Sequence, residues 1–372
     1  MTIYLDNAAT TPLHPKVKEA MTNAFDLFGN PSSVHGLGRK SHHQILEARE
    51  VIAKSIGANQ EELVFTASGS EGDNMAIRQS VLLNKSKGNH IITTAIEHPA
   101  VLNTMKQLEN EGFDVTYLPV DKNGEISLAD FDEALTEQTI LVSVMYGNNE
   151  VGSLMPIQAI AKKLEHHQAI FHTDAVQAYG TEDIDVKDLG IDLLSVAAHK
   201  INGPKGIGFL YIRQGLPLKA MITGGEQENH RRAGTENTPA IMGFKAAVEV
   251  LTKEEKACRK QKYQAYKAYI IQQLTKAGVE VQVNGSLTGL PHILNLWVRK
   301  NSQIVQTRLD MQQIAISTGS ACTAGNVAPS HVLEAMYGKD PRVTESIRIS
   351  FGYDTTKEEV EQFTDTLIKI LK

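Results

Sequence analysis

The chain has 372 residues, of which 41% are hydrophobic and 22% are charged, and its formal net charge is −6. This composition indicates a globular protein of about two domains, and the negative balance argues against direct binding to nucleic acid or to a membrane surface. No apolar run approaches the roughly 18 residues of a membrane span, and the first residues lack the basic and apolar regions of a secretory signal.

Cysteine and histidine usage points to a reducing compartment and to no metal site. The two cysteines, Cys258 and Cys322, lie far apart in different contexts. A disulfide framework is therefore not expected, and the cytoplasm is the expected location. The thirteen histidines show no HExxH spacing and the chain has no CxxC pair, so we expect no metal centre.

Short apolar runs alternate with helical patterns between about residues 60 and 215. The runs predict strands at 63–66, 90–93, 115–118, 139–144, 169–172, 193–196 and 207–212. Helical periodicity lies between them, for example over 100–111 and 156–165. This alternation is typical of βαβ units and predicts an α/β fold with a mostly parallel sheet, in which a ligand binds beyond the carboxyl ends of the strands.

The pattern changes after a charged amphipathic helix that is predicted over 253–276. Short strands predicted at 279–283, 293–298 and 346–351 indicate a smaller α+β domain. We expect a large domain over 15–255, and a small domain formed by 1–14 together with 256–372.

Lys200 is the strongest candidate for chemistry. A predicted buried strand ends in His199-Lys200, and a Gly/Pro loop follows at once. Burial there would lower the pKa of the amine and make it nucleophilic, so that it could form a Schiff base with an aldehyde cofactor. Asp174, at another predicted strand end, is the carboxylate that the ring nitrogen of pyridoxal 5′-phosphate (PLP) requires. Lys205 is a rival, but it lies within a turn and should be more solvated.

Three further segments could line a cofactor site, although each has a plainer interpretation. Gly69 and Ser70 stand between a predicted strand and a helix, where N–H groups and a hydroxyl favour phosphate, but helix caps have the same pattern. His98 could stack on a cofactor ring and move protons, yet a lone histidine before a helix is more often structural. Asn149 could donate to a phenolic oxygen, or it could simply belong to an Asn/Gly turn.

Arg348 and Cys322 are candidates for contact with a substrate. Arg348 alternates with apolar residues on a predicted strand, so its guanidinium could hold a carboxylate; a solvent-facing arginine fits the same pattern. Cys322 lies among small, turn-forming residues, a setting that suits a nucleophile that must reach a substrate and then a partner. Cys258 lies in the charged helix, and we expect no functional role for it.

In their joint order, these residues make the chain resemble the cysteine desulfurases, which are fold-type I PLP enzymes of the class V aminotransferase group. The matching segments run nearly end to end, at 4–11, 30–35, 97–99, 148–152, 174–177, 199–200, 232–237 and 320–323. The segments 319–323 and 329–333 are similar to the group I desulfurases of the NifS and IscS types. The resemblance favours the functional interpretation of His98, Ser70 and Asn149.

The resemblance implies a role for each matched residue. The catalytic residues would be Cys322, Lys200 and His98, with Lys200 holding PLP and moving protons. The cofactor-binding residues would be Lys200, Asp174, Gln177, Ser70, Gly69, His199, Asn149 and Thr235. The substrate-binding residues would be Arg348, Asn149 and Asn30. Thr235 matches a residue that reaches the phosphate of the other subunit, which implies a homodimer.

The activity implied by the resemblance is the removal of sulfur from L-cysteine, which gives L-alanine and a persulfide on Cys322. The sulfur would pass to an acceptor protein, for iron–sulfur cluster assembly or tRNA thiolation. The alternatives are a selenocysteine lyase or a class V aminotransferase, neither of which needs Cys322 on such a loop. A non-enzymatic scaffold or regulator is disfavoured because Lys200, Asp174 and Cys322 are all present.

Two positions depart from the family pattern. Ala197 stands where the family usually has a serine that helps to bind phosphate, and a hydrogen bond to a charged group is worth about 1.5–3 kcal/mol. Ser195 or a water molecule would have to compensate for its loss. The stretch 227–232 is also unusual, because the family more often has glycine near Asn229 or His230.

Overall fold

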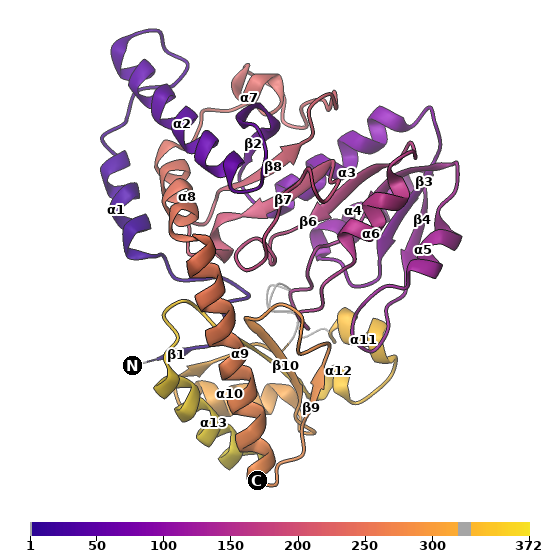
Figure 1. The fold of residues 1–372 in the computed structure, drawn as a ribbon, viewed down its shortest axis with the longest axis vertical. Coiled ribbons are helices and arrows are strands. Elements are labelled where there is room, and N and C mark those ends of the chain that lie inside the picture. Colours follow the sequence, from indigo (N-terminus) through magenta and orange to yellow (C-terminus); the bar gives the residue numbers. More distant parts are fainter. Residues whose placement is uncertain (1, 319–328) are drawn as a thin grey trace.

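The computed structural model describes residues 2–318 and 329–372. A seven-stranded sheet forms the centre of its larger part (Figure 1), in the order β2-β8-β7-β6-β5-β3-β4. Its strands are β2 (Leu63–Thr66), β3 (His90–Thr94), β4 (Asp114–Leu118), β5 (Thr139–Ser143), β6 (Ile170–Asp174), β7 (Leu193–Ala197) and β8 (Gly208–Ile212). β8 pairs antiparallel with both neighbours, and the other pairs of this sheet, in the described residues, are parallel. The predicted mostly parallel sheet is confirmed, with each strand within two residues of its expected bounds.

Helices cover both faces of this sheet. They are α1 (Pro15–Ala24), α2 (Gly36–Lys54), α3 (Gly69–Asn84), α4 (Pro99–Asn110), α5 (Leu128–Ala134), α6 (Ile157–Leu164), α7 (Gln227–His230) and α8 (Thr238–Val250). Val64 and Ile91 pack with α3 and α4, whereas their neighbours Phe65 and Ile92 belong to the cluster formed with α2, α6 and α8. Burial of both faces explains why the strands read as nearly continuous apolar runs.

The residues after α8 (orange to yellow in Figure 1), together with β1 at the N-terminus, form a smaller part that has its own apolar core. Its elements are β1 (Ile3–Tyr4), α9 (Lys253–Lys276), β9 (Gln282–Asn284), β10 (Ile293–Trp297), α10 (Ser302–Asp310), β11 (Ile314–Ala315), α12 (Arg342–Glu345), β12 (Ser346–Ser350) and α13 (Lys357–Leu371). The buried residues of α11 (His331–Tyr337) belong instead to the core of the larger part. The strand expected at 279–283 begins three residues later, as β9. Across the two described stretches of chain, no helix has both the length and the apolar character that crossing a membrane requires.

The N-terminal segment contacts both parts of the molecule. β1 pairs with β11, and Leu5 belongs to the core of the smaller part. Thr11 and His14, in contrast, donate backbone hydrogen bonds to the carbonyls of His199 and Asn202, each at 3.0 Å. The division into 15–255 and 1–14 with 256–372 therefore remains a proposal, and these contacts favour placing residues 8–14 with the larger part.

The backbone of α7 is unusual. Glu228, Asn229 and His230 have φ angles of 52°, 55° and 61°, in the left-handed region where a β-carbon crowds the backbone. The Glu228 carboxylate anchors this segment, because it accepts two hydrogen bonds from Arg49 (2.8 and 2.6 Å) and one from the backbone N–H of Phe65 (2.9 Å). The strained conformation gives a physical reason why glycine is commoner here in the family.

Replacing His230, which is exposed, by glycine should raise the midpoint of thermal unfolding. The exchange relieves a left-handed conformation that disfavours L-residues by roughly 1–2 kcal/mol, and part of this gain is lost to the greater freedom of glycine in the unfolded chain. The matched control is His43→Gly within α2, which should lower the midpoint because glycine is a poor helix former. Equal destabilisation by both exchanges would contradict the interpretation.

Candidate active site

Lys200 and Asp174 lie at the carboxyl ends of neighbouring strands. β6 ends at Asp174, and Asp174 pairs in parallel register with Ser195 of β7. A short 3₁₀ turn (Ala198–Lys200) follows β7 directly and brings Lys200 to the same edge of the sheet. The adjacency expected from the sequence is therefore present, at the edge where open α/β sheets bind ligands.

The N-terminal segment covers Lys200. The Lys200 ammonium donates hydrogen bonds to the backbone carbonyls of Ala8 (2.5 Å) and Ala9 (2.9 Å). Beside it, His199 Nδ1 lies 3.1 Å from the hydroxyl of Thr10, and burial lowers the pKa of His199 to about 4. Residues 8–10 thus hold the lysine and histidine of the candidate site in place, a contribution that the sequence alone did not reveal.

His98 faces Asp174 across the site. It caps α4 by accepting a hydrogen bond from the Ala100 N–H to Nδ1 (3.1 Å). Burial, together with Lys200 and His331, lowers the pKa of His98 against the opposing effect of Asp174, and burial raises the pKa of Asp174. Because Nδ1 accepts the Ala100 N–H, the neutral form of this imidazole carries its proton on Nε2 and can donate it there.

A third acidic residue, Asp73 of α3, belongs to the same group. One ligand-type atom each of Asp73, His98 and Asp174 lies within 4.8 Å of the others. Such a group could hold a metal ion or could face the nitrogen of a cofactor ring. Sequence spacing did not reveal Asp73, because the three residues come from three separate segments that meet only in the fold.

Gln177 is held between the N-terminal segment and the smaller part. Its amide donates to the carbonyl of Ala8 (2.8 Å), and its Oε1 lies 3.2 Å from Nε2 of His292. Burial lowers the pKa of His292 to about 3, so this ring is neutral and donates to Gln177 through Nε2–H. Ala8 and His292 together fix the orientation of the Gln177 amide, and the sequence analysis had not singled out His292.

The loop before α3 passes very close to the ends of β6 and β7. A β-carbon on Gly69 would lie 2.7 Å from Val176 Cγ2 and 3.7 Å from the Ala197 methyl group. Glycine is therefore required here for the loop to approach. The helix cap is Ser68, whose hydroxyl accepts from the Glu71 N–H (3.1 Å), so Ser70 is an exposed residue outside the capping role that the sequence also allowed.

Ser195 does not replace the serine that is missing at position 197. Its side chain is fully buried, and its hydroxyl lies 3.0 Å from Nε2 of His172, inside the protein. Ala197, in contrast, faces the Gly69 loop. The compensation by Ser195 that the sequence allowed is therefore not favoured, because its hydroxyl lies within hydrogen-bond distance of His172 rather than beside the Gly69 loop.

Arg348 is 2% exposed, which rules out the solvent-facing interpretation. Its guanidinium donates to Asp6 Oδ1 and to the backbone carbonyl of Asn149, each at 2.9 Å. Nε has no hydrogen-bond partner among the described residues. The arginine of the smaller part thus reaches the Asn149 loop of the larger part.

Asn30 accepts a hydrogen bond from the Ser32 N–H within its own exposed loop (2.9 Å), and its role in substrate binding stays a prediction.

Cys322 lies outside the described residues, but both flanking segments are anchored near the candidate site. Ser317 exchanges backbone hydrogen bonds with Arg348 (3.1 and 2.7 Å). The Ser330 hydroxyl donates to the buried carboxylate of Glu150 (2.5 Å), next to Asn149. The chain therefore leaves and re-enters the described structure beside Arg348 and Asn149.

Thr235 is exposed on the surface of this chain. An ion pair between Arg232 and Glu71 (2.9 Å) ties its segment to the first turn of α3. The position suits contact with a second molecule.

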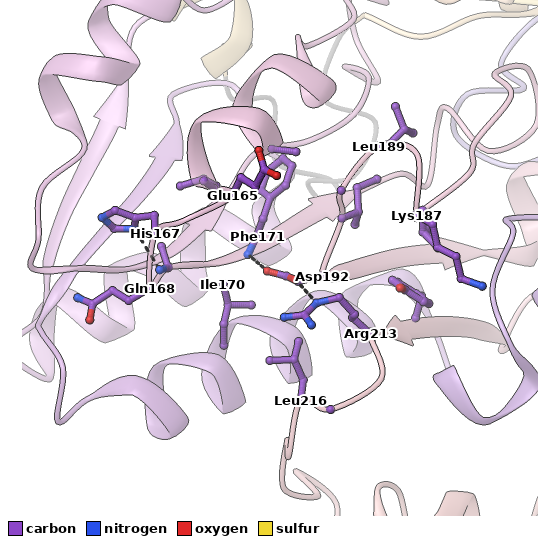
Figure 2. A pocket seen from close by; sticks show the side chains of 18 of the residues that line it. Glu165, His167, Gln168, Ile170, Phe171, Lys187, Leu189, Asp192, Arg213 and Leu216 are labelled. Carbon is purple, nitrogen blue, oxygen red and sulfur yellow. Dashed lines mark hydrogen bonds and ion pairs between the residues drawn. The ribbon is translucent and has the colours of Figure 1, made fainter.

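A separate cavity of about 1310 Å³ lies at the amino ends of the strands, opposite the end that carries Lys200 (Figure 2). Its lining includes Phe171 near the start of β6 and Asp192 just before β7. Asp192 accepts hydrogen bonds from the Phe171 N–H (2.9 Å) and from Arg213 (2.5 Å). The cavity lies at the amino ends of these strands, away from Lys200, so its size does not make it the reactive site.

Comparisons with known proteins agree with this geometry. A family model described as aminotransferase class-V matches residues 3–363. The putative cysteine desulfurase IscS 1 of Bacillus subtilis (strain 168) is 52% identical over 374 residues, which cover 100% of this chain and 98% of that protein. The cysteine desulfurase IscS of Dictyoglomus turgidum is 43% identical, with 100% and 94% covered.

Solved structures show the same fold over nearly the whole chain. A structure titled NifS-like protein matches with a TM-score of 0.93 at 34% identity, over 100% of this chain and 99% of the other. A structure titled SspA in complex with cysteine matches with a TM-score of 0.83 at 37% identity, over 94% and 99%. With full-length relatives, a matching family model and the expected residues at the strand ends, the chain belongs to the aminotransferase class-V family and, within it, to the cysteine desulfurases.

Proposed function

We propose that this protein uses PLP to remove sulfur from L-cysteine and that Cys322 receives the sulfur as a persulfide. The observation that carries the proposal is the position of Lys200 beside Asp174 and His98 at the carboxyl ends of β6 and β7, in a chain of the cysteine desulfurase family. The structure titled with bound cysteine, from a 37% identical protein, supports the choice of substrate.

The described residues fit PLP. The close-packed Gly69 loop leaves backbone N–H groups at the start of α3, where phosphate binds favourably. Lys200 would hold the aldehyde carbon and Asp174 would face the ring nitrogen. Gln177 and Asn149 would bind the phenolic oxygen. Gly69, Ser70 and His199 would hold the phosphate, together with Thr235 from a second subunit. When bound, PLP supplies an electron sink that permits bond breaking at the substrate α-carbon.

Different residues of the chain would transfer protons, hold the substrate and accept the sulfur. Lys200 would take the proton from the substrate α-carbon, and neutral His98 would donate the proton of its Nε2 and later regain it. Arg348 would hold the substrate carboxylate with Asn149 and Asn30 nearby. The Cys322 thiolate would attack the substrate sulfur, so that an S–S bond forms while the C–S bond breaks. The electron pair of the C–S bond would stay with the carbon skeleton, which would take up protons and leave as L-alanine.

The surface around α1 and α2 supports a homodimer. Phe25, Phe28, Val34 and Leu37 are 68%, 76%, 88% and 51% exposed, an unusual concentration of bare apolar side chains. Val34 also lines a cavity of about 790 Å³ together with Glu236, the neighbour of Thr235. A second copy that covers this surface would bring Thr235 towards the phosphate of its partner.

We propose only the chemical class of the final sulfur acceptor, not its identity. A persulfide is transferred to another thiol, so the partner would be a thiol-bearing protein of iron–sulfur cluster assembly or tRNA thiolation. Thiol chemistry of this kind suits the reducing cytoplasm. The net charge of −6 favours a protein partner over direct contact with nucleic acid.

Cys322→Ser should abolish sulfide release from L-cysteine in the presence of a reductant, because the serine hydroxyl cannot carry the sulfur. Sulfide and alanine are measured together, without an added keto acid. Cys258→Ser is the matched control and should retain wild-type turnover, since Cys258 is an exposed residue of α9. Wild-type turnover by Cys322→Ser would overturn the proposal, and a strict need for a keto acid would favour an aminotransferase.

Ala197→Ser should tighten PLP binding by roughly tenfold or more, because it restores a hydrogen bond worth about 1.5–3 kcal/mol to a charged group. Titration of the apoprotein with PLP, followed by absorbance, measures the change. Ala198→Ser should bring no such gain, because Ala198 belongs to the apolar cluster on the other face of the sheet. Unchanged affinity for Ala197→Ser would show that the phosphate lies elsewhere.

Phe28→Glu should convert the dimer to a monomer in sedimentation experiments, because it places a charge within the proposed apolar contact. Leu287→Glu, at a 50% exposed position in the smaller part, should leave the assembly unchanged. A wild-type chain that sediments as a monomer would contradict the proposed dimer.

A further inference from the structure

His292 lies beside the candidate active site, yet the proposed reaction gives it no role. It directly precedes β10 in the smaller part, and its ring reaches Gln177 in the larger part. Both residues line a small cavity of about 30 Å³ together with Lys200. A neutral imidazole offers one donor and one acceptor nitrogen, so the atoms that meet these nitrogens decide what the ring can do.

Hydrogen bonds anchor the backbone around His292 to both parts of the molecule. The His292 carbonyl accepts from the Phe351 N–H (2.9 Å), just beyond β12. Two residues earlier, the Leu290 N–H donates to the Gly152 carbonyl of the larger part (2.7 Å). The Leu290 carbonyl accepts from the ammonium of Lys267 (2.7 Å), an α9 residue that is 3% exposed. The imidazole is therefore attached to a backbone whose position is fixed.

The donors and acceptors around Gln177 allow one arrangement of its side-chain amide. A backbone carbonyl can only accept, so the Gln177 atom that lies 2.8 Å from the Ala8 oxygen is the amide nitrogen. The amide oxygen then lies 3.2 Å from Nε2 of His292, and Nε2 must be the donor of that bond. Reversing the amide would place its oxygen against the Ala8 carbonyl, with no proton between the two acceptors.

The His292 ring therefore carries its proton on Nε2. Nδ1 is buried and has no hydrogen-bond partner among the described residues, so no acceptor there meets a second proton. Burial, together with the positive charges of Lys267, Lys200 and Arg348, lowers the pKa of this ring to about 3. The ring is neutral and donates in one direction only.

This arrangement leaves one amide hydrogen of Gln177 available to the candidate site. Ala8 takes the other hydrogen, and His292 occupies the amide oxygen. The Ala8 carbonyl that accepts from Gln177 also accepts from the Lys200 ammonium (2.5 Å), so the two donors are neighbours. An anionic oxygen bound beside Lys200 would be stabilised by the remaining amide hydrogen.

We propose that His292 is a positioning residue, which holds the Gln177 amide oxygen so that the remaining amide hydrogen faces a ligand bound beside Lys200. The identity of that ligand rests on the proposed function, in which the hydrogen would bind the phenolic oxygen of PLP. The bond between His292 and Gln177 does not rest on it, because all of its atoms belong to this chain.

¹⁵N NMR of the apoprotein, labelled in histidine and glutamine side chains, tests the bond directly. From about pH 5 to 8, where an ordinary histidine changes its charge, His292 should keep the signals of a neutral ring protonated at Nε2. His292→Phe assigns these signals by removing them, and it should shift the side-chain amide signal of Gln177. Gln177→Leu assigns that amide signal. A ring protonated at Nδ1, or an amide signal that stays in place in His292→Phe, would overturn the proposal.

Two further variants distinguish positioning from a general loss of stability. His292→Gln retains an N–H donor and should restore most of the Gln177 signal; if His292→Phe does not fold, His292→Gln assigns the ring signals, and their tautomer decides. His90→Phe is the matched control, because His90 contacts the hydroxyls of Thr116 and Thr139 (each 2.8 Å) at the amino end of β3, away from Lys200. A Gln177 signal that moved equally in His90→Phe would contradict a specific role for His292.

Titration of the apoprotein with PLP, followed by absorbance, measures the consequence for the proposed cofactor. His292→Phe should weaken binding by up to about tenfold, because the Gln177 amide loses the partner that fixes its direction. His292→Gln should recover most of this affinity, and His90→Phe should leave it unchanged. Full affinity in His292→Phe would contradict the positioning role. A wild-type protein that binds no PLP would sink the proposed function, and the NMR signals would still decide the bond between His292 and Gln177.

Discussion

The burial of ionisable groups at the carboxyl ends of β6 and β7 is the constraint on which the rest of the site depends. Asp174 is 6% exposed and Asp73 is 1% exposed, and burial raises the pKa of both carboxyl groups. Burial also lowers the pKa of His98 and of His172, which favours their neutral forms. In such surroundings a charge persists only where a partner meets it. The site therefore favours a cationic ring beside Asp174, and it would distinguish sharply between protonation states of whatever binds there.

Segments remote in sequence complete this site. Ala8 and Ala9 accept hydrogen bonds from Lys200, and the Gln177 amide donates to Ala8. Arg348 reaches from the smaller part to the Asn149 backbone. A few residues of the N-terminal segment thus connect the lysine to both parts of the molecule. Changes in this segment would disturb the site without touching any of the residues that are proposed to carry out the chemistry.

The departures from the family pattern have different physical meanings. At 229 and 230, residues with side chains occupy a left-handed backbone that glycine would adopt more easily, and the Arg49–Glu228 ion pair holds the neighbouring residue in place. At 197, a methyl group faces the Gly69 loop, which is proposed to bind phosphate and where a hydroxyl would donate. The first departure concerns conformational stability and the second concerns affinity for an anion.

The sequence by itself determined the strand order along the chain, the strand ends that carry Asp174 and Lys200, and the family, because apolar periodicity and ordered motifs are local properties. It could not decide whether Ser68 or Ser70 caps α3, or between a buried and a solvent-facing Arg348. It also missed Asp73, His172 and His292. Only the tertiary structure decided these points, since burial, and the pKa shifts that burial causes, depend on which distant segments pack together.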